Sequence, residues 1–176
     1  MNGARVTALR PALFLDRDDT LVRDKGYMHR PEDLVWMPGA IAAVKAANDA
    51  GWRVVVVTNQ SGIGRGLFSV PQMDAFHAAM AADLAAHGAQ IDAWYFCPYH
   101  PDATIPAYRV ADHPDRKPNP GMLQRAIRDL ELDPDRSVMI GNTADDVEAG
   151  RRAGLRAFQV KEGELEACFS AVLAAA

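Results

Sequence analysis

Short apolar runs alternate along the chain with longer stretches in which apolar residues recur every three or four positions. The short runs predict buried parallel strands, and the longer stretches predict helices. Strands that alternate with helices predict a three-layer α/β domain with right-handed crossovers and a parallel sheet of about five strands. The predicted strands are 11–15, 52–57, 91–97, 137–140 and 155–160, and the predicted helices are 38–50, 71–87, 120–130, a short one that ends near residue 154, and 164–176.

The valine run 54–57 is typical of a strand that is buried on both faces, so we predict that it is the central strand. Two segments between the predicted elements are too long for simple turns. Residues 17–38, which contain glycine and proline breakers, should fold over the edge of the sheet as a flap. Residues 98–120 show no periodicity, and a loop of that length inside a compact domain is usually functional.

Composition narrows the class of protein. The chain has 176 residues, of which 49% are hydrophobic and 24% are charged, as in ordinary globular proteins. We expect one domain over 1–176, with 1–10 as an N-terminal extension. The net charge of −4 gives no reason to expect nucleic acid or a membrane surface as a partner. Two cysteines, no signal peptide and no membrane-length apolar run favour a cytoplasmic protein with reduced thiols. We also expect a monomer.

The first predicted strand ends in Asp16-Arg17-Asp18-Asp19-Thr20. Because side chains alternate along a strand, Asp16 and Asp18 should point the same way. Carboxylates at the carboxyl end of a parallel strand lie where open α/β sheets bind ligands. Two such groups repel each other unless a cation or a shared proton compensates. The pattern therefore predicts a divalent metal and phosphoryl transfer, in which one carboxylate attacks and the other moves protons.

Further polar residues fall after later strands or in the long loop, on what should be the same edge of the sheet. Each pair alone has an ordinary explanation as a helix cap, a turn or a solvated surface. Their combination in this order predicts an active site. The pairs are Asp16 with Asp18, Thr58 with Asn59, Arg116 with Lys117, and Asn142 with Asp146.

From about residue 13 to about residue 160, these motifs resemble the haloacid dehalogenase-like (HAD) phosphatase superfamily. Within it, the sequence resembles the branch that contains D-glycero-D-manno-heptose 1,7-bisphosphate phosphatases and histidinol-phosphate phosphatases. The resemblance implies a Rossmann-like domain, and the spacing of the motifs leaves no room for a large cap domain. The motifs are Phe14-Leu15-Asp16-Arg17-Asp18, Gly26-Tyr27, Thr58-Asn59-Gln60-Ser61-Gly62, Arg65-Gly66, Cys97-Pro98, Arg116-Lys117-Pro118 and Pro120-Gly121-Met122.

The resemblance also implies a role for each matching residue. Asp16 is expected to take the phosphoryl group as an aspartyl phosphate, and Asp18 to protonate the leaving alkoxide and then activate water. Thr58 and Lys117 are expected to stabilise the transferring group. The expected substrate-binding residues are Arg17, Asn59, Arg65 and Arg116, and the expected Mg²⁺ ligands are Asp16, Asp18, Asn142 and Asp146.

The sequence departs from the branch at two sites with chemical consequences. Asn142-Thr143 stands where the branch usually has Asp-Lys, so we expect an uncharged amide ligand and weaker Mg²⁺ binding. The branch also carries a zinc site after Cys97. The corresponding positions here are Cys97, Tyr99, His113 and Asp115, and two of these are poor zinc ligands. We therefore expect no structural Zn²⁺, and a loop held by aromatic and proline packing instead.

The expected function is hydrolysis of a small phosphorylated metabolite. The resemblance favours D-glycero-D-manno-heptose 1,7-bisphosphate, with removal of the 7-phosphate, and histidinol phosphate is the alternative substrate. A different class remains open, because the change at Asn142 and Thr143 could belong to a phosphate-binding protein that has lost turnover. An enzyme is favoured by the joint retention of Asp16, Asp18, Thr58 and Lys117.

Overall fold

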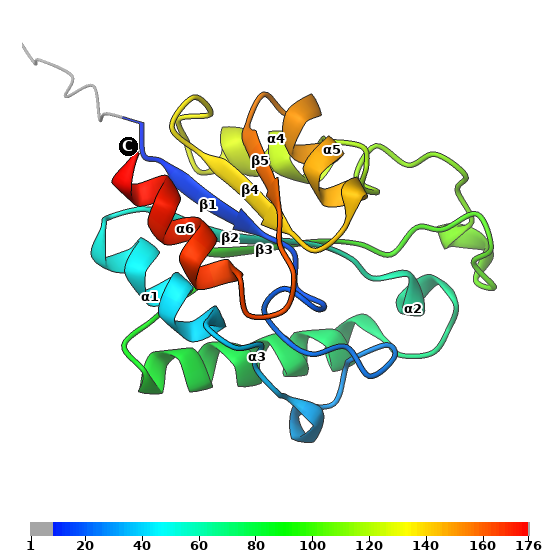
Figure 1. The fold of residues 1–176 in the computed structure, drawn as a ribbon. Coiled ribbons are helices and arrows are strands. Elements are labelled where there is room, and N and C mark those ends of the chain that lie inside the picture. Colours follow the sequence, from blue (N-terminus) through cyan, green and yellow to red (C-terminus); the bar gives the residue numbers. More distant parts are fainter. Residues whose placement is uncertain (1–8, 176) are drawn as a thin grey trace, which may run out of the picture.

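The computed structural model describes residues 9–175, which build a parallel sheet with the strand order β3-β2-β1-β4-β5 (Figure 1). Alternating residues of each strand face opposite layers. Phe14, for example, lies opposite Val55 on one neighbouring strand and Met139 on the other. The strands are β1 (Ala12–Leu15), β2 (Arg53–Asn59), β3 (Ala93–Cys97), β4 (Val138–Gly141) and β5 (Arg156–Gln159).

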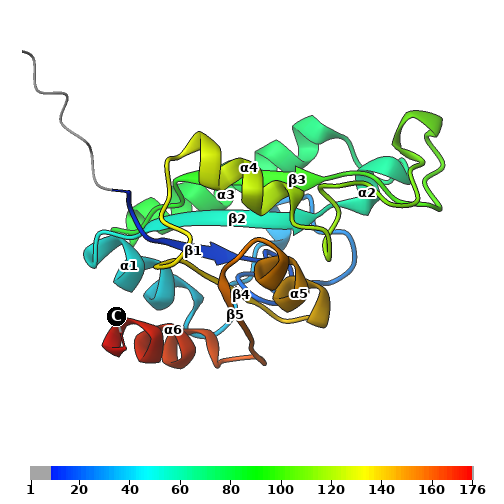
Figure 2. The same ribbon diagram turned by 90° about the horizontal axis from the view of Figure 1, so that it is seen from above.

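Helices cover both faces of the sheet, as Figures 1 and 2 show. On one face, Leu13, Val54 and Ile140 pack against three helices, and on the other face Phe14, Val57 and Met139 pack against two. The first layer consists of α1 (Ala40–Asp49), α3 (Val70–Ala86) and α6 (Leu165–Ala174), and the second of α4 (Gly121–Asp129) and α5 (Ala144–Arg152). This arrangement is the three-layer α/β fold that the sequence predicts.

The predicted strands and helices are confirmed, with shifts of one to a few residues at their ends. The prediction that the valine run is the central strand is wrong. That run lies in β2, and β1 occupies the centre of the sheet. A short helix, α2 (Ser61–Gly64), was not predicted because its two glycines have low helix propensity. Of the predicted N-terminal extension, residues 1–8 lie outside the described residues.

The segment between β1 and α1 folds back over the end of β1, as predicted for the flap. Val22 bridges to both Asp18 and Trp36, and its side chain is fully buried. A single 3-10 turn, η1 (Pro31–Asp33), forms its outer bend. Asp19 has φ of 53°, a left-handed conformation that Asp adopts more readily than most residues. The flap therefore combines a buried apolar anchor with a polar edge that faces the end of the sheet.

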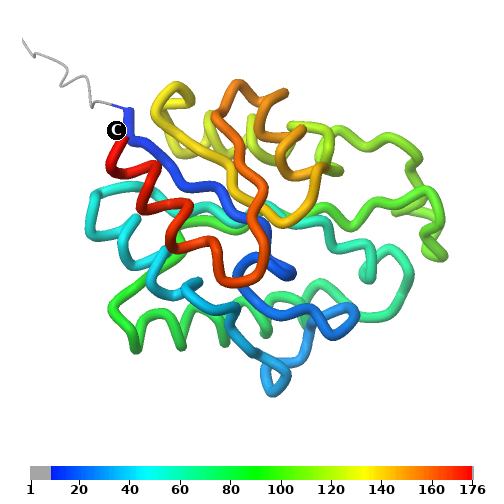
Figure 3. Tube along the Cα trace, viewed as in Figure 1, coloured from blue at the N-terminus to red at the C-terminus, as the bar shows by residue number. Residues whose placement is uncertain are grey.

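Two other loops extend past the same end of the sheet, as Figure 3 shows. The first contains α2, and the second is the predicted long loop 98–120, which contains the 3-10 turn η2 (Pro106–Tyr108). The two loops contact each other, since the N–H of Ile105 donates to the carbonyl of Gly64 at 3.0 Å. Among residues 9–175, no helix is both long and apolar enough to cross a membrane.

Helix α5 approaches β4 and β5 closely because residue 150 is glycine. A Cβ atom there would lie 2.7 Å from Cβ of Met139 and 2.9 Å from Cβ of Ala157. We expect Gly150→Ala to lower the free energy of unfolding by about 1–3 kcal/mol, although alanine favours a helix. Urea denaturation measures this change. Arg151→Ala on the exposed face of α5 is the control, and equal stability of the two variants would contradict the close packing.

Candidate active site

Asp16 lies directly after the central strand. Its backbone N–H donates to the carbonyl of Ile140 on β4 at 3.3 Å, which holds the residue against that strand. The side chain is almost buried, and its Oδ1 accepts a hydrogen bond from Nζ of Lys117 at 2.8 Å. A carboxylate in this position is rigid and partly stripped of water, and these properties suit a nucleophile.

Lys117 reaches this carboxylate from the end of the long loop. Its Nζ also donates to Oδ1 of Asp146 at 2.5 Å and to the carbonyl of Val57 at 2.8 Å. Burial by itself lowers the pKa of Lys117, but the carboxylates of Asp16 and Asp146 outweigh this effect and raise the pKa above the ordinary value. The ammonium group therefore stays charged, and all three of its N–H donors have acceptors.

Burial raises the pKa of Asp16 to about 7. Lys117 opposes this rise, whereas the negative charges of Asp146 and Asp18 add to it. The single positive charge of Lys117 therefore does not balance the negative charges of the carboxylates around it. A second positive charge close to Asp16 would favour its ionised, nucleophilic form at neutral pH.

Residues at the end of β2 contact both Lys117 and Asp18. Asn59 forms a reciprocal pair with the backbone of Lys117: its Oδ1 accepts from the Lys117 N–H, and its Nδ2 donates to the Lys117 carbonyl, both at 3.1 Å. The buried Gln60 donates to Oδ2 of Asp18 at 2.9 Å and to Oγ1 of Thr58 at 2.8 Å. We did not predict a separate role for Gln60, although it belongs to the motif after β2. The structure makes it the link between Asp18 and Thr58.

The prediction that Arg17 binds substrate is corrected by the structure. The side chain is fully buried, and its guanidinium contacts both carboxylate oxygens of Asp18, through Nε at 2.9 Å and Nη2 at 3.1 Å. Its partners are protein atoms, so it acts on Asp18 and does not face the cavity.

Asp146 has both carboxylate oxygens occupied by protein donors. Oδ1 accepts from Lys117, and Oδ2 accepts from the backbone N–H of Thr143 at 3.0 Å and from its hydroxyl at 2.7 Å. Thr143 and Asp146 form a capping box at the start of α5. This geometry is a reason to replace our predicted direct metal contact of Asp146 with a role in holding Lys117.

Asn142 completes a group of converging oxygen atoms. The outer end of its amide lies 3.3 Å from the backbone carbonyl oxygen of Asp18 and 3.3 Å from Oδ2 of Asp16. When the amide oxygen points toward them, the site presents three oxygens with no hydrogen between them. Such a set suits a hard divalent cation. When the amide nitrogen points inward, it donates to both oxygens and closes the site without a cation.

These groups line a cavity of about 260 Å³ at the carboxyl end of β1. Its walls are strongly acidic, and Lys117 is the one cation among the lining residues. An anionic ester could not enter such a site favourably without additional positive charge. The lining residues are Asp16, Asp18, Asp19, Asp24, Asn59, Lys117, Asn142, Thr143, Asp145 and Asp146.

Two predicted substrate-binding arginines do not line this cavity. Nη1 of Arg116 donates to the carbonyl of Tyr99 at 3.1 Å, and Nη2 of Arg65 lies 3.4 Å from the ring nitrogens of His100. Both therefore lie among the loops beyond the reaction site. In the same loops, Tyr99 stacks on His113 with ring centroids 3.7 Å apart and meets Tyr108 edge-on, as predicted for loop packing.

A parallel sheet that carries an aspartate pair after its central strand, with a buried lysine facing it, defines the class of HAD-like hydrolases. A family model described as "HAD-hyrolase-like" matches residues 115–169. A D-glycero-beta-D-manno-heptose-1,7-bisphosphate 7-phosphatase from Rhodopseudomonas palustris is 42% identical and covers 93% of this chain and 91% of its own. A relative from Thermosynechococcus vestitus with the D-glycero-D-manno form of that name is 44% identical over 88% of this chain and 80% of its own. The chain belongs to this family of heptose-bisphosphate phosphatases.

Solved structures agree with this placement. A HAD-like protein from Mesorhizobium loti superposes with a TM-score of 0.86 and 38% identity, over 98% of this chain and 90% of that one. The D,D-heptose 1,7-bisphosphate phosphatase from B. bronchiseptica, complexed with magnesium and phosphate, gives a TM-score of 0.82 and 28% identity, over 94% and 99%.

Proposed function

We propose that this protein is a Mg²⁺-dependent phosphatase that removes the 7-phosphate of D-glycero-D-manno-heptose 1,7-bisphosphate. The observation that carries the proposal is the cavity at β1, where the carboxylate of Asp16 lies between the ammonium of Lys117 and the oxygens around Asn142. The similarity to heptose-bisphosphate phosphatases along nearly the whole chain supports the substrate.

The chemistry follows from the positions of the two aspartates. An oxygen of Asp16 attacks phosphorus, the bond from phosphorus to the sugar oxygen breaks, and Asp18 gives its proton to the departing oxygen. In the second step, Asp18 takes a proton from water as the water oxygen attacks phosphorus. The bond to Asp16 then breaks and phosphate leaves. The positive charge of Lys117 and the hydroxyl of Thr58 stabilise the negative charge of the phosphoryl group.

A divalent cation fits the converging oxygens described above. Asp16, the backbone carbonyl of Asp18 and the amide oxygen of Asn142 would hold Mg²⁺, and Asp146 would contribute indirectly by orienting Lys117. When bound, Mg²⁺ supplies the positive charge that draws an anionic ester into this acidic cavity.

The reaction cavity adjoins a second one of about 480 Å³, which shares Asp19, Asp24 and Asn142 with it. The second cavity also contains two cationic side chains, Arg23 and Lys161. This space suits an ester whose uncleaved part is long and polar, and it supports an extended sugar phosphate over a small one.

A substrate screen tests the proposal. Purified protein with Mg²⁺ is incubated with the α and β anomers of the heptose bisphosphate, with other sugar phosphates and with histidinol phosphate, and released phosphate is measured. We expect the heptose bisphosphate to have the highest kcat/KM. Preference for histidinol phosphate would reassign the substrate. A stable phosphoprotein without turnover would favour the phosphate-binding alternative.

Asn142→Asp tests the metal site. A carboxylate adds a negative charge to the set of oxygen ligands, so we expect Mg²⁺ to half-saturate activity at about a 10-fold lower concentration. The measurement is initial rate against Mg²⁺ concentration. Asn48→Asp, on α1 away from the cavity, is the control. An unchanged Mg²⁺ dependence in the Asn142 variant would show that this residue is not a ligand.

Four further expectations belong to the proposal: a monomer, a cytoplasmic location, no nucleic-acid or membrane partner, and no structural Zn²⁺. The side chains at the zinc positions of the branch support the last of these. Tyr99 and His113 stack on each other, and Asp115 pairs with Arg125 at 2.7 Å. Metal analysis that finds one tightly held zinc per chain would contradict it.

A further inference from the structure

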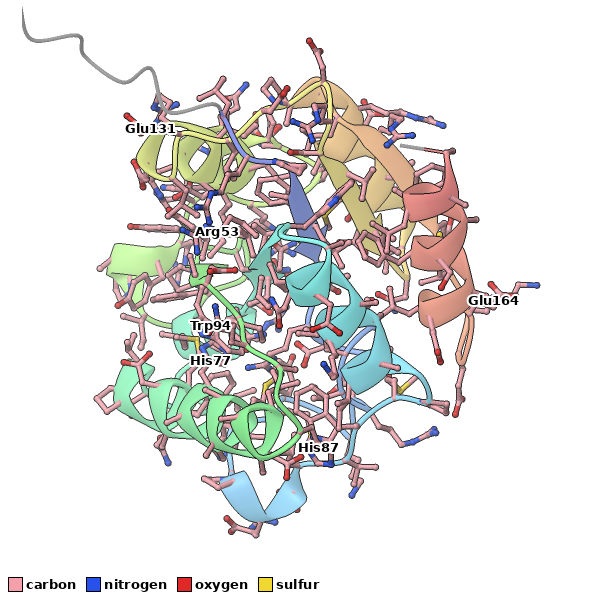
Figure 4. The ribbon with its side chains drawn as sticks, turned by 90° about the vertical axis from the view of Figure 1, so that its left-hand side faces the viewer. Arg53, His77, His87, Trp94, Glu131 and Glu164 are labelled. Carbon is pink, nitrogen blue, oxygen red and sulfur yellow. The ribbon has the colours of Figure 1, made fainter. Side chains whose placement is uncertain are left out.

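His77 of α3 lies at the far side of the buried guanidinium of Arg17. Nε2 of His77 is 3.2 Å from Nη1 of Arg17, and the imidazole is almost buried. The ring stacks on Trp94 of β3 with centroids 4.2 Å apart and an interplanar angle of 15°. Figure 4 shows His77 and Trp94 next to each other between α3 and the sheet. The imidazole therefore has one defined orientation.

The hydrogen bond between them has one possible direction. A guanidinium can only donate, so Nε2 of His77 must accept and its ring proton must be on Nδ1. Burial, together with the positive charge of Arg17, lowers the pKa of His77 to about 3. The imidazole is therefore neutral under ordinary conditions and remains an acceptor.

Arg17 in turn determines where the carboxylate of Asp18 lies. Nη2 of Arg17 lies 3.0 Å from the carbonyl oxygen of Met28 and 3.0 Å from Oε1 of Gln60, and Cζ lies 5.1 Å from the centroid of the Phe76 ring. Nε and Nη2 contact the two oxygens of Asp18, a bidentate geometry that fixes the carboxylate plane. Removing the acceptor at His77 leaves Nη1 of this buried, charged group without its partner, which costs free energy and removes one of the contacts that hold the guanidinium in place.

We propose that His77 is a positioning residue for the reaction: it fixes Arg17, which aligns the carboxylate of Asp18 with the leaving oxygen of the substrate. The inference rests on the proposed function, because Asp18 has a proton to deliver only if the protein cleaves phosphate esters. His77 itself touches no substrate. Its effect should therefore appear in the step that depends on Asp18 and not in substrate binding.

The leaving group provides the test. A sugar alkoxide needs a proton from Asp18 as it departs, whereas p-nitrophenolate departs without one. For His77→Leu we expect kcat/KM with the heptose bisphosphate to fall about 10-fold further than with p-nitrophenyl phosphate, with little change in KM. His77→Gln, which keeps an acceptor near Nε2, should recover most of the loss. His87→Leu at the exposed end of the same helix is the control and should match the wild type.

Each outcome is decisive. Equal losses with the two esters, or a His77→Gln variant as defective as His77→Leu, would overturn the positioning role while the proposed function stands. A wild-type protein that hydrolyses neither ester would overturn the proposed function and the inference with it. If His77→Leu does not fold, Trp94→Leu removes the stacking partner and keeps the imidazole. It should then give a smaller loss that is again selective for the sugar ester, and a loss equal for both esters would overturn the role.

Discussion

The Asp16→Asn variant should fold and should lose phosphate release by about 10⁴- to 10⁶-fold, as expected when a nucleophile is removed. An amide has nearly the shape of the carboxylate and can still accept the hydrogen bond from Lys117, but it cannot form an aspartyl phosphate. Released phosphate measures the loss of turnover, and incorporation of label from a labelled ester measures the loss of the aspartyl phosphate. Asp49→Asn on the exposed face of α1 is the control. Turnover in the Asp16 variant above about 1% of wild type would assign the attack to another group.

Asp16→Asn should also change how the stability of the protein depends on pH. Because the pKa of Asp16 is raised to about 7 in the folded protein, the folded state holds this proton more tightly than the unfolded state does. Without Mg²⁺, the wild type should therefore lose stability as the pH rises from about 4 to about 7 and change little from this cause above pH 7. Asp16→Asn should lack this loss and should be more stable than the wild type at pH 8. Melting temperatures across this pH range, with and without Mg²⁺, measure the difference. The prediction would be contradicted if, between about pH 4 and about pH 7 without Mg²⁺, the melting temperature of the wild type fell no more than that of the variant.

Lys117→Met should have the second largest effect, on both stability and activity. It leaves the buried carboxylates of Asp16 and Asp146 without their shared ammonium. Removing one partner of a buried ion pair costs about 3–5 kcal/mol, and loss of a positioned cation at the phosphoryl group lowers kcat by about 10²- to 10³-fold. Urea denaturation and steady-state kinetics measure the two effects.

The matched control for Lys117→Met is Lys45→Met. Lys45 also forms an ion pair, with Asp49, but on the exposed surface of α1, where such pairs contribute little. Mg²⁺ should restore part of the stability of Lys117→Met, because it places positive charge beside Asp16. If the two lysine variants were equally stable, the buried pairing of Lys117 would not be an important interaction.

The sequence was sufficient to predict the layers of the fold and the convergence of Asp16, Asp18, Asn59 and Lys117. Both follow from local rules: apolar periodicity defines the elements, and the carboxyl ends of parallel strands meet at one edge. The position of β1 at the centre was not predictable in this way. Strand order depends on which helix faces pack together, and a valine run is equally suited to any interior position of the sheet.

The errors in the site have a similar cause. Arg17 was expected to bind a phosphate because it belongs to a loop of the predicted site, but its charge is balanced inside the protein by Asp18. No role was predicted for His77, which lies four residues after Met73 and next to Phe76 on the buried face of α3. Its partner could not be inferred, because the contact joins residues sixty positions apart in the chain. The spacing of apolar residues predicts which face of a helix is buried. It does not predict which polar side chains from distant parts of the chain meet on that face.

The reciprocal amide pair between Asn59 and Lys117 has a consequence for how this architecture can diversify. It attaches the base of the long loop to β2, immediately before the catalytic ammonium. Insertions, deletions or substitutions at the tip of the loop can therefore accumulate while the lysine keeps its place. New substrate preferences can arise there by evolution or by loop grafting, without rebuilding the machinery that breaks the ester bond.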